Sequence, residues 1–152
     1  MSGTGGTTEP NLALALLRAA DWFDEALRAR LADGGVALTR SQAQVFAALE
    51  PAGSTTADLA RRVGVTRQSM HRQVAELVSL GLLTTDADAR DARLRVVRLT
   101  RVGAAVVRRA RRELVAVEAE LAERVGEDHV AALRDVLAQD WGSPPGPPER
   151  SR

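Results

Sequence analysis

The stretch that decides the fold runs from residue 55 to residue 83 and reads TTADLARRVGVTRQSMHRQVAELVSLGLL. Thr55 followed three residues later by Asp58 is a helix-capping pattern, because both side chains can bond the free N–H groups of a first turn. This pattern predicts a short helix that ends near Arg62. The sequence Val63-Gly64-Val65 then predicts a tight turn. A short capped helix closed by a glycine turn is therefore expected at the start of the stretch.

A second helix and a hairpin follow this turn. Thr66 is a suitable N-cap, and helical periodicity continues to Gly81. Beyond Gly81 that periodicity is lost, and residues 82–85 and 95–99 are typical of two short strands joined by the polar loop 86–94. Two helices joined by a three-residue turn form a helix-turn-helix, and a hairpin behind them makes the winged version. The expected fold class is mainly α with a small β-hairpin wing.

The second helix of this motif has two unlike faces. One side gathers the apolar residues expected in the core, which are Met70, Val74, Leu77 and Val78. The other side carries the polar residues Arg67, Gln68, Ser69, His71 and Arg72. Such groups hydrogen-bond base edges and phosphates, and they lie in the N-terminal half of the helix, which enters the major groove in this motif. Considered alone, the helix is better explained as a surface helix with a polar outer face, and the basic hairpin that follows changes this interpretation.

The predicted hairpin is basic around its tip. Asp91 and Arg93 lie near the tip, and Arg90, Arg95 and Arg98 surround them. A guanidinium on a projecting loop can enter the minor groove of DNA, whose negative potential attracts it. A neighbouring carboxylate can hold that guanidinium in one orientation. The alternative is a salt bridge confined to the loop.

Two helices are predicted before the motif. Asn11 is a suitable N-cap for a helix that runs to about Ala32, where two glycines follow. Thr39 and Gln42 form a capping box for a second helix, which runs to Glu50 and stops before a proline. The motif is therefore expected to begin after one long helix and one short one.

Two helices are predicted after the hairpin, and the long helices indicate a dimer. Thr100 caps a helix that reaches about Val125, and the last helix runs from Glu127 to about Trp141. At 1.5 Å per residue the first and fifth helices are roughly 33 and 39 Å long. A compact domain of this size has a radius of gyration of only about 15 Å. These helices would overhang a single-chain core, so we expect a homodimer formed by the first, fifth and sixth helices.

The charge of the chain is strongly segregated. All 21 basic residues are arginine, and the formal net charge is +1. Residues 55–112 hold 13 arginines and 5 acids, a net charge of +8, whereas the remaining residues hold 8 arginines and 15 acids, a net charge of −7. A basic central region in a nearly neutral chain predicts a polyanionic partner for that region.

Composition excludes several classes of protein. With 45% hydrophobic and 27% charged residues, the chain has ordinary globular composition. No apolar run approaches the roughly 20 residues of a membrane span, and the first ten residues lack the features of a secretory signal, so a cytoplasmic location is expected. The absence of cysteine excludes disulfides and thiol chemistry. With His71 and His129 as the two histidines, neither a metal site nor a cofactor is expected.

The segment from Asp88 to Gly103 resembles the wing signature of the MarR family of winged-helix regulators, roughly D-x-x-D-x-R-x-x-x-V-x-L-T-x-x-G. Four further motifs stand where that family places its second helix, third helix, turn and fourth-helix exit: Leu38-Thr39-x-x-Gln42, Asp58-Leu59-Ala60, Val63-Gly64-Val65 and Leu80-Gly81-Leu82-Leu83. The resemblance extends over about residues 11–141. One departure is Ala89, where the family often has proline, and it indicates a looser wing tip.

This resemblance implies a dimeric transcriptional repressor or activator that binds a pseudo-palindromic operator. It places Asp91 and Arg93 in the minor groove and the polar residues of the fourth helix in the major groove, with Arg95 beside the wing. The Gly/Thr-rich residues 1–10 and the Pro-rich residues 142–152 are expected to be disordered tails. Between them we expect dimerisation helices at 11–35 and 101–141 and a winged helix-turn-helix at 36–100.

The same resemblance implies control by a small, often aromatic and anionic effector between the dimerisation helices and the winged helix. Arg18 and Trp22 lie one turn apart on the first helix, so a guanidinium and a ring could share one effector pocket there. The alternative is that Trp22 belongs to the dimer core and Arg18 to a surface ion pair. These two residues are the candidate effector-binding pair.

Two other function classes compete with DNA-dependent regulation. In the first, the winged helix is a dimerisation or protein-interaction module that has lost DNA binding, but the basic central region and the Asp91–Arg93 pair argue against this hypothesis. In the second, the chain is an enzyme. The sequence lacks a glycine-rich phosphate loop, a thiol and an informative histidine–carboxylate spacing, so no catalytic site is expected.

Overall fold

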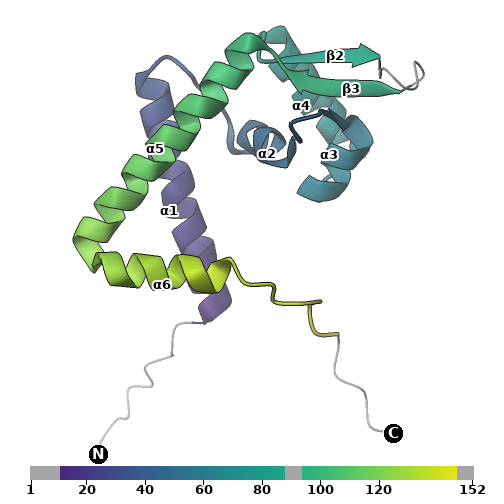
Figure 1. The fold of residues 1–152 in the computed structure, drawn as a ribbon. Helices are drawn as coiled ribbons and strands as arrows, with labels where there is room; N and C mark the ends of the chain where they lie inside the picture. Colours follow the sequence, from purple (N-terminus) through teal and green to yellow (C-terminus); the bar gives the residue numbers. More distant parts are fainter. Residues whose placement is uncertain (1–10, 88–93, 147–152) are drawn as a thin grey trace, which may run out of the picture. The chain divides into compact units, whose positions relative to one another are not determined.

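The computed structural model describes residues 11–87 and 94–146 (Figure 1). Within these residues the elements are, in chain order, α1 (Leu12–Asp33), α2 (Arg40–Ala48), β1 (Ser54–Thr55), α3 (Thr56–Val63), α4 (Arg67–Ser79), β2 (Leu83–Ala87), β3 (Arg95–Leu99), α5 (Arg101–Val125) and α6 (Glu127–Leu137). Mainly helical architecture with a small sheet is thus confirmed. The predicted tail at 1–10, the wing tip with Asp91 and Arg93, and residues 147–152 lie outside the described residues.

The chain divides into two compact units, Met1–Val117 and Glu118–Arg152. The first unit contains the elements from α1 to β3 and the larger part of α5. The second contains the end of α5 and all of α6. Within the second unit, Arg134 forms an ion pair with Glu118, and the Trp141 indole Nε1 donates to the Val136 carbonyl at 3.0 Å.

Side-chain caps define where several helices begin. The Asn11 side chain accepts hydrogen bonds from the backbone N–H groups of Ala13 and Leu14. Thr39 and Gln42 form the predicted capping box at the start of α2. The Thr66 hydroxyl accepts from the Ser69 N–H at the start of α4, at 3.1 Å. Each bond satisfies a donor that has no partner within its helix, so the predicted starts are confirmed.

The predicted ends were less accurate. Helix α2 ends at Ala48, two residues before Glu50, because Leu49 adopts an extended backbone conformation. Helix α6 ends at Leu137 and does not reach Trp141. Strand β2 continues to Ala87, beyond the predicted end at residue 85.

The predicted glycine turn after α3 is confirmed. Gly64 ends α3 in the left-handed conformation, with φ of 76°, which suits glycine because it has no Cβ.

The sheet has three antiparallel strands in the order β1-β3-β2. In the hairpin Leu83 pairs with Leu99 and Ala87 pairs with Arg95, and on the other side of β3 Ser54 pairs with Val97. Strand β1 was not predicted. It is two residues long, and its second residue, Thr55, also caps α3. A strand this short has no periodicity of its own, so pairing with β3 defines it.

The core of the first unit lies between α2, α3, α4 and the sheet. Its largest fully buried side chains include Val45, Leu59, Met70, Leu77, Leu83 and Val97. The prediction for α4 was correct for three of its four apolar residues. Val78 is 39% exposed, whereas Gln73 is only 7% exposed. Helix α4 is therefore rotated so that Gln73, and not Val78, completes its buried face.

Candidate nucleic-acid interface

Helix α4 presents a basic, polar face to solvent. Arg67, Gln68, His71 and Arg72 are exposed, as the sequence predicted. Ser69 is half-buried at the edge of this face, and its hydroxyl accepts a hydrogen bond from the Gln73 Nε2 at 3.3 Å. Within residues 11–87 and 94–146, neither Arg67 nor Arg72 forms an ion pair with an acidic side chain. Both guanidinium groups are thus available to an external anion.

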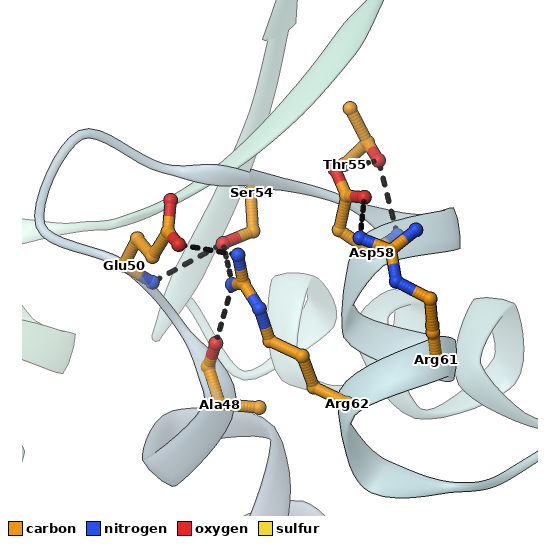
Figure 2. Close-up of polar contacts among 7 residues, drawn as sticks. All are labelled: Ala48, Glu50, Ser54, Thr55, Asp58, Arg61 and Arg62. Carbon is orange, nitrogen blue, oxygen red and sulfur yellow. Dashed lines mark hydrogen bonds and ion pairs between the residues drawn. The ribbon is translucent and has the colours of Figure 1, made fainter.

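Arg62 fixes the end of α3 to the segment that follows α2 (Figure 2). Its Nη1 donates to the Ala48 carbonyl at 3.0 Å and to the Ser54 hydroxyl at 3.1 Å. Its Nη2 pairs with the Glu50 carboxylate. The Ser54 hydroxyl also accepts from the Glu50 N–H at 3.1 Å. This guanidinium therefore has a structural role, because it holds α2, β1 and α3 together.

Asp58 caps α3 and neutralises the neighbouring arginine. The Thr55 hydroxyl donates to Asp58 Oδ2 at 2.7 Å and accepts from the Asp58 N–H at 3.1 Å. The Arg61 Nη2 donates to Asp58 Oδ1 at 2.7 Å. The predicted cap is confirmed, but the reciprocal bond comes from the Thr55 hydroxyl instead of its backbone N–H. Arg61 and Arg62 thus contribute less free positive charge than the sequence count indicates.

These contacts predict that the fold loses some stability in acid. The Thr55 hydrogen bond and then the Arg61 hydrogen bond lower the pKa of Asp58 below its ordinary value of 3.8. A group whose pKa is lower when folded stabilises the fold above its unfolded pKa, and this stabilisation disappears as the pH falls through the folded pKa. We expect Asp58→Asn to unfold at lower urea concentration than wild type at pH 7, and the difference to shrink below pH 4. If the two proteins differ by the same urea concentration at pH 7 and at pH 2.5, the charge of Asp58 contributes nothing to the stability of the fold.

The described part of the wing carries two further cations. Arg95 is exposed at the start of β3, where it pairs with Ala87 at the end of β2. Arg98 is half-buried on the same strand. Asp91 and Arg93, which the resemblance to the MarR family places in the minor groove, lie outside the described residues, so their role stays a prediction.

The base of the wing is tied to α4 by Thr100. The Thr100 N–H donates to the Leu82 carbonyl at 3.1 Å, and the Thr100 hydroxyl donates to the Gly81 carbonyl at 2.6 Å. The same hydroxyl accepts from the Gly103 N–H at 3.0 Å, so Thr100 is the predicted cap of α5. Gly103 packs directly on this turn, because a Cβ added there would lie 1.9 Å from the Leu82 carbonyl oxygen. Thr100 and Gly103, the threonine and glycine of the wing signature, therefore share one structural role: both hold the start of α5 against the turn that follows α4.

A cavity of about 250 Å³ lies behind the motif, between α1, α2 and α5. Its lining consists of Leu27, Leu31, Leu38, Ala43, Phe46, Ala47, Leu49, Val106, Val107, Ala110, Arg111 and Leu114. Arg111 supplies the one charged side chain of this lining and pairs with no acidic residue in the described segments. An apolar enclosure with one cation is suited to a small apolar molecule that carries one negative charge.

The candidate effector pair does not line this cavity. Arg18 is exposed on α1. Trp22 is half-buried and packs edge-to-face on Phe23, with ring centroids 5.1 Å apart. Arg111 was not selected from the sequence. Its position on α5 gave no signal, because four arginines lie within five residues there and the cavity forms only when α1 and α2 pack against that helix.

The described residues contain no group of three or more histidine, aspartate or glutamate side chains placed to hold a metal ion. None of the helices in this part of the chain is both long enough and apolar enough to cross a membrane.

Comparison with known proteins connects this arrangement with a family. A family model described as MarR family matches residues 38–94, which extend from just before α2 to the wing. The solved structure of the transcriptional repressor CouR bound to a 23-mer DNA duplex is 30% identical, with a TM-score of 0.69, over 91% of this chain and 97% of that one. The chain belongs to the MarR family. Members of this family are transcriptional regulators and not enzymes.

Other MarR-family proteins support the same fold. Apo MarR from E. coli is 22% identical, covers 84% of this chain and 94% of its own, and superposes with a TM-score of 0.70. The transcriptional regulator AdcR of Streptococcus pneumoniae serotype 2 is 35% identical over 65 residues. That match spans 43% of this chain and 44% of AdcR, less than half of either protein. The winged-helix architecture predicted from the sequence is confirmed.

Proposed function

We propose that this MarR-family regulator binds double-stranded DNA as a homodimer, with α4 in the major groove as the recognition helix. The observation that carries this proposal is the exposed face of α4, where Arg67 and Arg72 have no acidic partner in the described segments. Its buried face is anchored by Met70 and Leu77, which are fully buried. A rigid helix with free cations and amides in its first two turns is suited to phosphates and base edges. The similarity to DNA-bound CouR supports the proposal.

Each site residue has a proposed role. Arg67 and His71 contact phosphates or bases at the edge of the groove, Gln68 and Arg72 read base edges, and Ser69 supports them from the edge of the helix. Arg95 contacts the backbone beside the wing. Asp91 orients Arg93, which enters the minor groove and gains most where that groove is narrow.

Salt dependence tests the proposal directly. Each phosphate neutralised by an arginine releases counterions, so the logarithm of affinity is expected to fall by about 0.9 per tenfold increase in salt for each phosphate neutralised. Fluorescence anisotropy with a duplex selected from random DNA would measure this slope. Tight binding with a slope near zero would contradict arginine–phosphate contacts. Absence of binding by an intact dimer would favour the alternative, a winged-helix module that binds another protein.

The homodimer is supported by apolar surface on the terminal helices. Leu12, Leu14 and Leu17 of α1 are 70%, 55% and 59% exposed. On α6, Leu133, Val136 and Leu137 are each more than 40% exposed. Exposed apolar side chains that gather on one helix are typical of a surface that binds another protein chain. A closed twofold dimer would bury them and place two recognition helices on one pseudo-palindromic operator.

We expect the protein to be a dimer at micromolar concentration, without a stable folded monomer. Light scattering would give about twice the chain mass of 16.2 kDa. Leu14→Arg together with Leu17→Arg would place charges in the apolar surface and shift the mass towards one chain. A cooperatively folding species of one-chain mass in the wild type would contradict the dimer.

An effector would act through the cavity between α1, α2 and α5. We propose a small apolar molecule with one carboxylate or similar anion, for which an aromatic acid has suitable chemistry. Its ring would contact Leu31 and Phe46, and its anion would pair with Arg111. Binding would release or modulate the DNA complex, in the cytoplasm where the operator is found. In this proposal Arg111 replaces the Arg18–Trp22 pair, neither member of which lines the cavity.

A further inference from the structure

Helix α2 contacts both the cavity and the recognition helix. Ala43, Phe46 and Ala47 of α2 line the cavity. Gln42, in the first turn of the same helix, is only 8% exposed, and its Nε2 donates to Glu76 Oε2 of α4 at 3.2 Å. A helix moves as a rigid element, so a displacement at its cavity side also moves its other residues. The two sites are thus joined through one short helix.

The Gln42 side chain is held at both ends. Its Oε1 accepts from the Thr39 N–H at 3.1 Å, while its Nε2 bonds Glu76. The first residue of α2, Arg40, is in turn tied to α1 by a 2.5 Å contact between its Nη1 and Asp21 Oδ1. A side chain fixed to its own backbone cannot relax independently when the helix moves. Movement of α2 therefore reaches Glu76, one turn beyond Arg72 on the recognition helix.

The bond to Glu76 is charge-assisted, which makes it stronger than a bond between two neutral groups. A second acceptor lies one turn earlier on α4, because Gln73 is 7% exposed and its Oε1 has no hydrogen-bond partner among residues 11–87 and 94–146. Residues three apart lie next to each other on a helix surface. An arrangement of α2 and α4 that also gives this oxygen a donor would compete with the observed one.

We infer that the Gln42–Glu76 hydrogen bond positions the recognition helix and transmits occupation of the cavity to it. Gln42 and Glu76 are positioning residues, since neither is placed in the DNA-contacting set. The inference rests on the proposed function, because it assigns the regulatory contact of that same cavity. It predicts that filling the cavity accelerates amide exchange in α4, and that this acceleration requires the Gln42–Glu76 hydrogen bond.

The test uses a side chain as the cavity probe. Ala110 lies on α5 and lines the cavity but belongs to neither α2 nor α4. Ala110→Phe would place a ring in the cavity of the full-length protein, and hydrogen–deuterium exchange without DNA would follow the amides of residues 67–79. We expect α4 exchange to accelerate about tenfold, a typical size for coupling between sites. In a Glu76→Ala background, the same substitution is expected to change α4 exchange by less than about twofold.

A reversed pair is the sharpest control. Gln42→Glu retains an acceptor for the Thr39 N–H but faces Glu76 with a second carboxylate, and the response is expected to be lost. Adding Glu76→Gln exchanges donor and acceptor, and the tenfold response is expected to return. A merely structural role for either residue would not be restored in this way.

Two results would overturn the inference: an equal α4 response with and without Glu76, or no response in an Ala110→Phe protein that has native far-UV circular dichroism. If Ala110→Phe fails to fold, Ala110→Leu provides the same test with a smaller side chain. Because exchange is measured without DNA, failure to bind any duplex would contradict the proposed function and not this contact.

Discussion

Replacing Gly103 with alanine is expected to lower the free energy of unfolding by about 2–3 kcal/mol, at the upper end of the usual cost of overpacking. The added Cβ would lie 1.9 Å from the Leu82 carbonyl oxygen, which is backbone and cannot rotate away as a side chain could. Alanine favours helices over glycine by up to about 1 kcal/mol, but that gain is smaller than the cost of separating α5 from the turn. Urea unfolding at fixed protein concentration would measure the change.

Gly146→Ala is the matched control for this experiment. Nothing lies within 4 Å of a Cβ built at Gly146, so alanine there is expected to be neutral. The Gly103 variant should also weaken DNA binding, because the Thr100 and Gly103 contacts fix the base of the wing to the end of α4. An unfolding free energy within about 0.5 kcal/mol of wild type, the range of ordinary surface substitutions, would show that the turn adjusts easily.

Replacing Arg72 with alanine is expected to weaken binding to a selected operator by about 5- to 150-fold, corresponding to about 1–3 kcal/mol for a lost base contact. Gln68→Ala should cause a loss of the same kind at a different base pair. Both side chains are exposed, so the variants should fold and dimerise as the wild type does. Anisotropy titrations on selected and scrambled duplexes would separate base reading from phosphate contact.

Arg28→Ala is a suitable control for charge. Arg28 lies on α1 and pairs with Asp24 at 3.1 Å, so its removal changes the net charge equally without touching α4. We expect it to leave operator affinity nearly unchanged. If Arg72→Ala weakens the selected and scrambled duplexes by equal factors, Arg72 contacts phosphate alone. If it weakens neither, the exposed face of α4 is not the recognition surface.

Predictions from the sequence were most accurate where the deciding contact is local. Thr39, Thr55 and Thr66 cap helices through hydrogen bonds to residues three positions away. The glycine turn after α3 follows from one residue that tolerates a positive φ. Helix ends were harder, because Ala48 and Leu137 end their helices where no strong breaking residue stands.

The candidate site was partly predictable for a related reason. Arg67, Gln68, His71 and Arg72 share one face of a regular helix, so helical periodicity alone shows that they lie together. Periodicity does not define the exact rotation of that helix, and Val78 was therefore assigned to the core in place of Gln73. Arg61 and Arg62 count as free cations in the sequence, whereas Asp58 and Glu50 neutralise them in the folded protein.

By itself the sequence determined the helices, their caps, the winged helix-turn-helix order and the polar face of α4, because these depend on neighbours within one or two turns. The tertiary structure decided the rest. Thr100 meets Gly81 across 19 positions, Arg62 meets Glu50 across 12 and Gln42 meets Glu76 across 34. The cavity with Arg111 likewise requires α1, α2 and α5 together. Such contacts leave no periodic pattern, since each exists only after separate segments have packed against one another.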